Sequence, residues 1–458
     1  MPDEPQLTGR VVWPREPIYL TERLDYNERF SFWPRVIVFC YNAQDVANAL
    51  RWAAFHGAPV RARCGRHSYE AFSLVDDGVI IDVSYMDQVT VNGDGTATVQ
   101  AGIDLWPLYQ ALWAHGVTIP GGSCPTVGVS GLTLGGGFGL LGRQLGLTCD
   151  SLVALEMVTA AGEVVHADEE RNPELLWASR GGGGGNFGVV TSLTFRVHPV
   201  SDVSVYNLTW PWSDLPEVVR AWQGWAPYAD PRLTSILKLT AKSSGTVSSI
   251  GQLAAGGSAE LVRMLEPLVS AGSPTYVEVQ TLPYIDAVKQ FAGLTPGEEH
   301  WTAHWHGDHS RFKNTSAYVR EPFGDEAIAA LVRSLEAAPA SADLVQLDAY
   351  GPPCAVDRVP REATAFWHRE GTLWNMQFQA YWTDDADQDR NLRWVEGFRT
   401  AMLPFTHGAY VNYCDIDIAD WPEAYYGGNF ARLVEVKAKW DPENVFNFAQ
   451  SIPTHLPR

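Results

Sequence analysis

Two different spacings of hydrophobic positions alternate along the first 200 residues. The apolar run 36–39 predicts a buried strand, and Val46 and Leu50, which follow the cap residue Asn42, recur at helical spacing until Gly57. Further strands are predicted at 79–83, 97–100, 152–159, 163–167 and 189–197, and a further helix at 104–115. Strands and helices are mixed, so we expect an α+β fold.

The second half of the chain has a different character. A helix is predicted at 327–337 and a strand of alternating polar and apolar residues at 373–382, which together favour a sheet backed by helices. Tryptophan and tyrosine become frequent after His198-Pro199, where the glycine-rich motifs stop. We therefore expect domains at 1–200 and 201–404 and a C-terminal segment at 405–458.

Composition excludes several classes of protein. With 458 residues, 46% hydrophobic and 19% charged, the chain is typical of a globular protein with more than one core. Its formal net charge of -20 argues against a nucleic-acid partner, because phosphate backbones would be repelled. No apolar run approaches the roughly 20 residues that cross a bilayer, and the first residues do not resemble a secretion signal. We expect no membrane contact and a cytoplasmic location.

Two short motifs each place a nucleophilic side chain among small residues. They are 63–69, which contains His67, and 121–128, which contains Cys124. Taken alone, such a histidine is usually a surface group and such a cysteine a small buried apolar residue. The six cysteines of the chain have no paired Cys-x-x-Cys spacing, which argues against a structural zinc site or a disulfide framework.

Glycine is concentrated in two further loops, 131–139 and 181–188. Glycine lets backbone amides approach and point at a pyrophosphate, so these loops and 63–69 suit a dinucleotide bound without a P-loop lysine. They lack the strand and helix context of a Rossmann fingerprint. Each loop taken singly is also explained as a flexible surface loop.

Taken together, these motifs resemble the berberine-bridge-enzyme-like FAD-linked oxidases, a bicovalent-flavin subgroup of the vanillyl-alcohol-oxidase or PCMH-type FAD-binding superfamily. The resemblance extends along nearly the whole chain. It implies a PCMH-type FAD-binding domain over 1–200, an antiparallel-sheet substrate-binding domain backed by helices over 201–404, and a C-terminal segment over 405–458 that returns to the FAD domain. Its motifs are densest at 61–70, 121–139, 180–190 and 409–453.

The same resemblance implies two covalent bonds to FAD. His67 would bond the 8-methyl group of the flavin and Cys124 would bond ring carbon six. The remaining residues expected to contact FAD are Arg63, Cys64, Gly65, Arg66, Ser68, Tyr69, Gly122, Thr126, Val127, Gly128, Gly131, Gly135, Gly136, Gly137, Gly139, Gly185, Asn186, Gly188, Val190, Asn412 and Tyr413.

Arg66 departs from the family pattern, which commonly has two glycines before the histidine. Two hypotheses stay open. If the position requires positive φ, the arginine is strained there; alternatively, its guanidinium contacts the pyrophosphate.

Removal of a hydride from a carbon that bears a hydroxyl requires a base for the hydroxyl proton. Tyr413 matches the tyrosine assigned to this role in several relatives, although a tyrosine there could also simply pack on the flavin. Strand periodicity puts Asn375, Gln377 and Gln379 on one face. Some relatives have a glutamate base where Asn375 stands, and an amide cannot replace it, so we expect Asn375 and Gln377 to hydrogen-bond substrate hydroxyls.

Two features complete the candidate chemistry. His300, His304, His306 and His309 fit no common zinc spacing, and we expect them at the rim of the substrate cleft, with no metal. Val127 stands three residues after Cys124, where relatives with valine tend to admit dioxygen and relatives with leucine tend not to.

We therefore expect an FAD-dependent oxidase, monomeric or homodimeric, that removes two electrons from a hydroxylated small molecule and reduces dioxygen to hydrogen peroxide. The amide face and the 18 tryptophans favour a sugar or oligosaccharide. The alternative is a natural-product tailoring oxidase that acts on an aromatic, glycosylated or alkaloid-like substrate. A quinone-dependent dehydrogenase and a non-catalytic flavin carrier are further alternatives.

Overall fold

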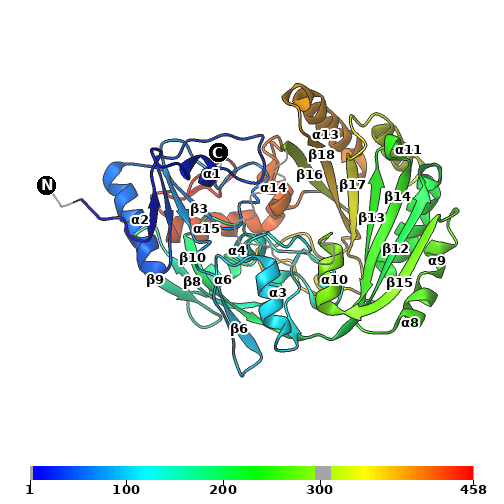
Figure 1. Ribbon diagram of the computed structural model, residues 1–458, viewed down its shortest axis with the longest axis horizontal. Coiled ribbons are helices and arrows are strands. Elements are labelled where there is room, and N and C mark those ends of the chain that lie inside the picture. The colour runs from blue at the N-terminus through cyan, green and yellow to red at the C-terminus, as the bar shows by residue number, and fades with distance from the viewer. Residues whose placement is uncertain (1–3, 294–310, 457–458) are drawn as a thin grey trace.

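A computed structural model describes residues 4–293 and 311–456, and its two halves lie side by side (Figure 1). The first half holds a four-stranded and a five-stranded sheet, and the second half holds one seven-stranded sheet. The predicted α+β fold with two main parts is confirmed.

The four-stranded sheet is built on parallel pairings. Its order is β1-β2-β4-β3, and β4 pairs in parallel with both β2 and β3. The strands are β1 (Arg10–Val12), β2 (Val36–Phe39), β3 (Val60–Arg63) and β4 (Val79–Asp82). Helix α2 (Ala43–His56) begins where the Asn42 side chain accepts a hydrogen bond from the Asp45 amide, and it ends at Gly57, whose φ is 60°. Both helix ends agree with the prediction from sequence.

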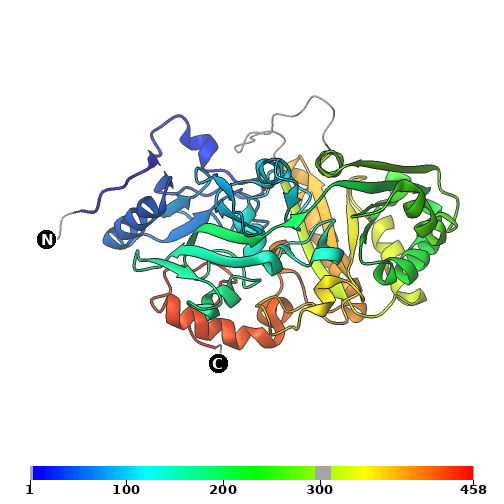
Figure 2. The same cartoon turned by 90° about the horizontal axis from the view of Figure 1, so that it is seen from below.

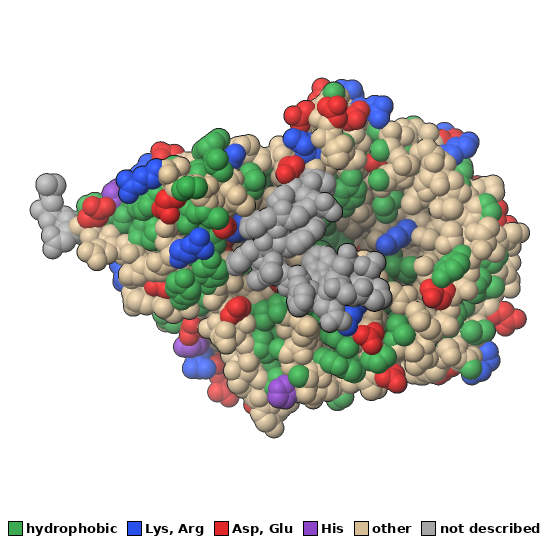
Figure 3. Space-filling model, in the orientation of Figure 1, with side chains coloured by type: hydrophobic (Ala, Val, Ile, Leu, Met, Phe, Trp, Pro, Cys, Tyr) green, Lys and Arg blue, Asp and Glu red, His purple; other side chains and the backbone are tan. Residues whose placement is uncertain are grey.

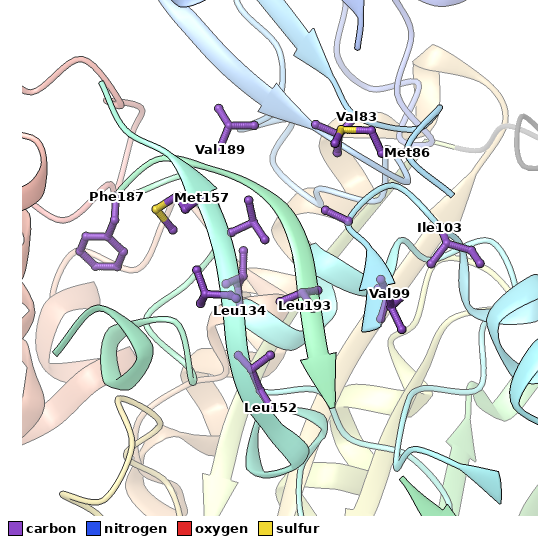
Figure 4. Close-up of a cluster of buried hydrophobic side chains, with 14 of the residues drawn as sticks. Val83, Met86, Val99, Ile103, Leu134, Leu152, Met157, Phe187, Val189 and Leu193 are labelled. Carbon is purple, nitrogen blue, oxygen red and sulfur yellow. The ribbon is translucent and has the colours of Figure 1, made fainter. Parts of the chain in front are cut away.

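The five-stranded sheet is antiparallel and carries the core of the first half. It runs β5-β6-β10-β8-β9, with β5 (Val89–Val91), β6 (Thr96–Gln100), β8 (Leu152–Val158), β9 (Val164–Ala167) and β10 (Val189–Arg196). Figure 4 shows Val99, Met157 and Leu193 from three of these strands in one buried cluster. The remaining elements of this half are α1 (Tyr19–Glu22), α3 (Leu105–Trp113), β7 (Val117–Thr118), α4 (Val129–Leu134), α5 (Gly142–Leu145), α6 (Pro173–Ala178) and β11 (His198–Pro199).

The seven-stranded sheet is antiparallel and has one face covered by helices. Its order is β15-β12-β14-β13-β17-β18-β16. The strands are β12 (Asp202–Pro211), β13 (Leu233–Thr240), β14 (Thr246–Leu253), β15 (Tyr276–Pro283), β16 (Arg311–Val319), β17 (Leu344–Ala349) and β18 (Trp374–Trp382). Helices α7 (Leu215–Trp225), α11 (Asp325–Glu336) and α13 (Gln388–Met402) pack on one face and form a second, separate core. Helices α8 (Ser258–Met264) and α9 (Glu266–Val269) contribute Leu261 and Leu268 to the same core. The opposite face turns toward the first half, beside α10 (Tyr284–Phe291) and α12 (Ala355–Arg358).

The C-terminal segment packs on the first half. Helices α14 (Trp421–Tyr426) and α15 (Phe430–Trp440) lie against it in Figure 2, and Leu433 shares the core that contains Leu193. Pro199 still pairs with Val117 in the first half, whereas Asp202 begins the seven-stranded sheet, so we propose this point as the domain boundary. Among the described residues, no helix combines the length and hydrophobicity needed to cross a lipid bilayer.

Candidate active site

The two halves share a cavity of about 500 Å³. Its walls come from the loop after β3, the loop before α4, residues 183–190, strands β16 to β18 and the C-terminal segment. Figure 3 shows the surface hollowed between the two halves. Segments that are far apart in the sequence therefore meet at one site.

Most residues predicted to contact FAD line this cavity. They are Arg63, Cys64, Gly65, Arg66, His67, Ser68, Tyr69, Gly122, Cys124, Val127, Gly128, Gly131, Gly185, Asn186, Gly188, Val190, Asn412 and Tyr413. The structure places Thr126, Gly135, Gly136, Gly137 and Gly139 outside the lining.

The glycine turn that follows α4 lies behind the cavity wall. A Cβ atom at Gly135 would lie 2.0 Å from Asn412 Oδ1, and the Gly137 amide donates a hydrogen bond to the Tyr410 hydroxyl at 2.7 Å. Glycine is needed here because the C-terminal segment approaches so closely. The glycine turn therefore affects the cavity indirectly, because it positions Asn412, and Asn412 lines the cavity.

His67 and Cys124 meet at the hydroxyl of Thr126. Thr126 Oγ1 lies 2.9 Å from His67 Nε2 and 3.8 Å from Cys124 Sγ. Burial lowers the pKa of His67 to about 4, so the imidazole is neutral at pH 7 and one ring nitrogen keeps its lone pair. One candidate nitrogen nucleophile, in His67, and one candidate sulfur nucleophile, in Cys124, therefore both lie next to the Thr126 hydroxyl.

A close backbone contact holds the loop of His67 against the start of α4. A Cβ atom at Gly65 would lie 2.3 Å from the Gly128 amide nitrogen, and one at Gly128 would lie 2.2 Å from Cys64 Sγ. Only glycine fits at either position. The two motifs predicted from the sequence are therefore in direct contact.

The structure answers part of the question about Arg66. Its φ is 63°, which is the strained conformation that one hypothesis required. Its Nη2 atom donates to Glu22 at 2.5 Å and lies 3.8 Å from Asp82, so this nitrogen is committed to carboxylates. Its Nη1 atom is buried without a hydrogen-bond partner among the described residues.

The residues at this end of the cavity fit a bound dinucleotide. Arg63 lines the wall, where its Nε atom donates to Asp82 at 2.6 Å and its Nη1 atom lies 3.7 Å from Asp25. Its Nη2 atom is buried with neither a hydrogen bond nor an ion pair in the described part of the chain. Gly183 and Gly185 have φ of 89° and 71°, so their loop can turn its amides inward. Buried arginine N–H groups that lack an acceptor, together with a glycine loop whose amides turn inward, fit a pyrophosphate.

The opposite end of the cavity holds a hydrogen-bonded row of polar side chains. The rings of Tyr413 and Tyr69 stack at 5.7 Å between centroids, and Gln377 Nε2 donates to the Tyr69 hydroxyl at 2.9 Å. Gln379 Nε2 donates to Gln377 Oε1, and the Tyr381 hydroxyl donates to Gln379 Oε1. Burial raises the pKa of Tyr413 well above its usual value, so the phenol needs an acceptor for its own proton before it can act as a base.

Asn375 is not at the cavity surface, although it shares a strand face with Gln377. It is fully buried and faces Asp348 of β17 in the register of the sheet. Our sequence reasoning missed Asp348, a buried carboxylate whose electrostatic effect reaches Tyr413. Burial raises its pKa to about 6. The alternation of Gln346 and Asp348 in the strand at 344–349 was the signal that could have revealed it.

A buried ion network lies beneath the two stacked tyrosines. Lys313 Nζ donates to Glu70 Oε1 and to Asp417 Oδ2, both at 2.8 Å, and it is also paired with Asp415. Glu70 follows Tyr69, and Asp415 lies two residues after Tyr413. Through Lys313 of β16, the network therefore connects the seven-stranded sheet to the two segments that carry Tyr69 and Tyr413.

We expect Lys313→Met to lower the free energy of unfolding by about 3–5 kcal/mol, because it leaves the buried carboxylate of Asp415 without its cation, whereas Glu70 keeps Arg29. Lys439→Met is the control, since Lys439 forms an exposed pair with Glu174 and should contribute less than about 1 kcal/mol. Urea denaturation followed by tryptophan fluorescence compares the two variants. Equal losses would show that the Lys313 network does not hold the halves together.

The predicted cluster of His300, His304, His306 and His309 lies outside the described residues. Within the described ranges, no group of three or more histidine, cysteine or acidic side chains could hold a metal ion.

Comparison with known proteins agrees with this geometry. Residues 34–168 match an FAD binding domain family, and residues 409–453 match the family "Berberine and berberine like". The chain is 43% identical to the FAD-linked oxidoreductase YgaK of Bacillus subtilis over 98% of each chain, and 32% identical to aclacinomycin-N/aclacinomycin-A oxidase of Streptomyces galilaeus over 93% of this chain and 86% of that one. The solved structure of a chitooligosaccharide oxidase is similar with a TM-score of 0.89 and 27% identity, over 97% of each chain.

Proposed function

Because this chain belongs to the berberine-bridge-enzyme-like family of FAD-linked oxidoreductases, we propose that it is an oxidase that removes two electrons from a sugar or oligosaccharide and reduces dioxygen to hydrogen peroxide. The observation that carries this proposal is the hydrogen-bonded row of Tyr69, Gln377, Gln379 and Tyr381 along the cavity wall. Amides and phenols both donate and accept, which is what a ligand with many hydroxyl groups requires. The similarity to a chitooligosaccharide oxidase supports the same substrate class.

In this proposal His67 and Cys124 hold the cofactor covalently. The neutral imidazole of His67 supports this role, because only an unprotonated ring nitrogen is a nucleophile. Burial raises the pKa of the Cys124 thiol, but the hydrogen bond with Thr126 opposes that shift and so favours the thiolate that would bond the cofactor. Two bonds would keep the cofactor in place while the substrate side stays open.

Bound FAD supplies hydride acceptance, and the chain supplies the proton transfer. Tyr413 accepts the proton of the substrate hydroxyl, and Asp348 takes up the phenolic proton. Asp348 suits this role because its pKa of about 6 leaves it mostly ionised at pH 7. Gln377 orients the substrate through its amide and holds Tyr69 in its stack with Tyr413. Asn375 keeps Asp348 in place from the neighbouring strand.

A tailoring oxidase of natural-product metabolism is the second candidate, because the chain is 32% identical to an aclacinomycin oxidase. The experiment that separates the two is anaerobic mixing with sugars, oligosaccharides and glycosylated aromatic compounds, read by loss of the flavin absorbance. Bleaching by simple oligosaccharides supports the first proposal. Bleaching only by glycosylated aromatic compounds supports the second.

A substitution at Val127 tests whether dioxygen is the electron acceptor. This small side chain lines the cavity, and a leucine there would extend further into the space that dioxygen needs. We expect Val127→Leu to slow reoxidation of the reduced enzyme by dioxygen at least about tenfold in rapid mixing. Val127→Ala is the control and should reoxidise at least as fast as the wild type. Unchanged reoxidation of the leucine variant would contradict the assignment.

A further inference from the structure

One cation lies on the substrate side of the seven-stranded sheet. Lys238 of β13 stands opposite Gln346 of β17, which in turn stands opposite Gln377 of β18. Its neighbours Leu237 and Leu239 point into the helix-covered core, so alternation directs Lys238 to the cavity side. The three side chains form one row across the sheet.

Lys238 lies partly buried without a close partner among the residues that the structure describes. Its side chain is half-buried, and the ammonium makes no ion pair or hydrogen bond with any residue of the described ranges. Asp348 is near enough to act on it electrostatically, but the Asp348 Oδ1 atom accepts from Gln346 instead. Loss of water around an unpaired ammonium costs free energy that a bound anion would recover.

The net charge of the chain and the distance from Lys238 to Gln377 indicate what kind of ligand Lys238 could bind. The chain has a formal net charge of -20, so an acidic ligand needs a local positive group to be accepted. Adjacent strands are about 4.8 Å apart, so Lys238 lies roughly 10 Å from Gln377 along the sheet. That separation is about the span of two linked sugar rings.

We propose that Lys238 binds a carboxylate on the second ring of the substrate, so that the preferred substrate is an acidic oligosaccharide with a uronate next to the ring that is oxidised. The proposal rests on the proposed function for the identity of the first ring. It adds a specificity-determining residue that lies one strand beyond Gln346 of the cavity wall.

The test compares two ligands that cannot be oxidised at their first ring, the methyl glycosides of cellobiose and of cellobiouronic acid. Calorimetric titration of the holoenzyme should give about tenfold tighter binding of the acid, and the preference should fall as salt is added. Lys238→Met should abolish the preference, whereas Lys238→Arg should keep most of it. Lys242→Met is the matched control, since this exposed lysine pairs with Glu336 and should leave the preference unchanged.

Equal binding of the two glycosides by the wild type would overturn the proposal, and so would a preference that survives in Lys238→Met. Anaerobic bleaching with free cellobiose and cellobiouronic acid separates this result from the proposed function. Bleaching by both sugars without any binding preference overturns the role of Lys238 and leaves the oxidase. Preferential binding of the acid without bleaching by either sugar supports the role of Lys238 and overturns sugar oxidation.

Discussion

Denatured protein that carries both His67→Ala and Cys124→Ala should release all of its FAD, while each single variant should keep the cofactor attached through one bond. The reason is that the two nucleophiles meet at Thr126, so each can reach the flavin independently. Mass spectrometry of the denatured chain measures the bound mass directly. A wild-type chain that loses its yellow colour on denaturation would refute covalent attachment.

Cys64→Ala provides the matched control for this prediction. Cys64 also lines the cavity, but its Sγ donates to the Ala101 carbonyl at 3.2 Å, and burial raises its pKa to about 12. A thiol that stays protonated is a poor nucleophile. This variant should keep both bonds, and loss of one bond would move the sulfur anchor from Cys124 to Cys64.

Tyr413→Phe should lower the rate of flavin reduction at least about a hundredfold, because the substrate hydroxyl loses its proton acceptor. Anaerobic stopped-flow spectroscopy measures this step separately from reoxidation. Tyr410→Phe is the control, since the Tyr410 hydroxyl accepts from the Gly137 amide and Tyr410 does not line the cavity. That variant should lose stability but less than tenfold in rate. If both variants behave alike, Tyr413 has only a packing role.

The pH dependence of the same step reports on Asp348. A carboxyl group accepts a proton only when it is ionised, and burial raises the pKa of Asp348 to about 6. The rate of flavin reduction should therefore rise as the pH increases through about 6 and level off above it. Asp348→Asn should be slow and should lack this rise. A rise that persists in the asparagine variant would assign it to another group.

The local sequence was sufficient for the elements that depend on neighbouring residues. The cap at Asn42 and the turn at Gly57 delimit α2 because both act within a few residues of the helix. The alternation of polar and apolar residues predicted strand β18. The same alternation places the amides of Gln377 and Gln379 on one face. His67 and Cys124 were predicted from the family resemblance of the motifs around them, because neither residue is informative when taken alone.

Contacts between distant segments could not be predicted in the same way. Asn375 has the same periodicity as Gln377, yet only the register of β17 against β18 puts it beside Asp348 and away from the cavity. Gly135 is a candidate cofactor ligand in the sequence, but in the fold it packs against Asn412 of the C-terminal segment.

The chain by itself thus indicated much of its secondary structure, its family and the candidate anchors His67 and Cys124, since these depend on short-range patterns and on motifs. The tertiary structure alone decided which polar groups share the substrate end. Strand pairing brought Lys238, Gln346 and Gln377 into one row from three separate segments. The hydrophobic pattern constrains the register of each strand pair, but which distant strands become neighbours is decided only when the whole sheet assembles.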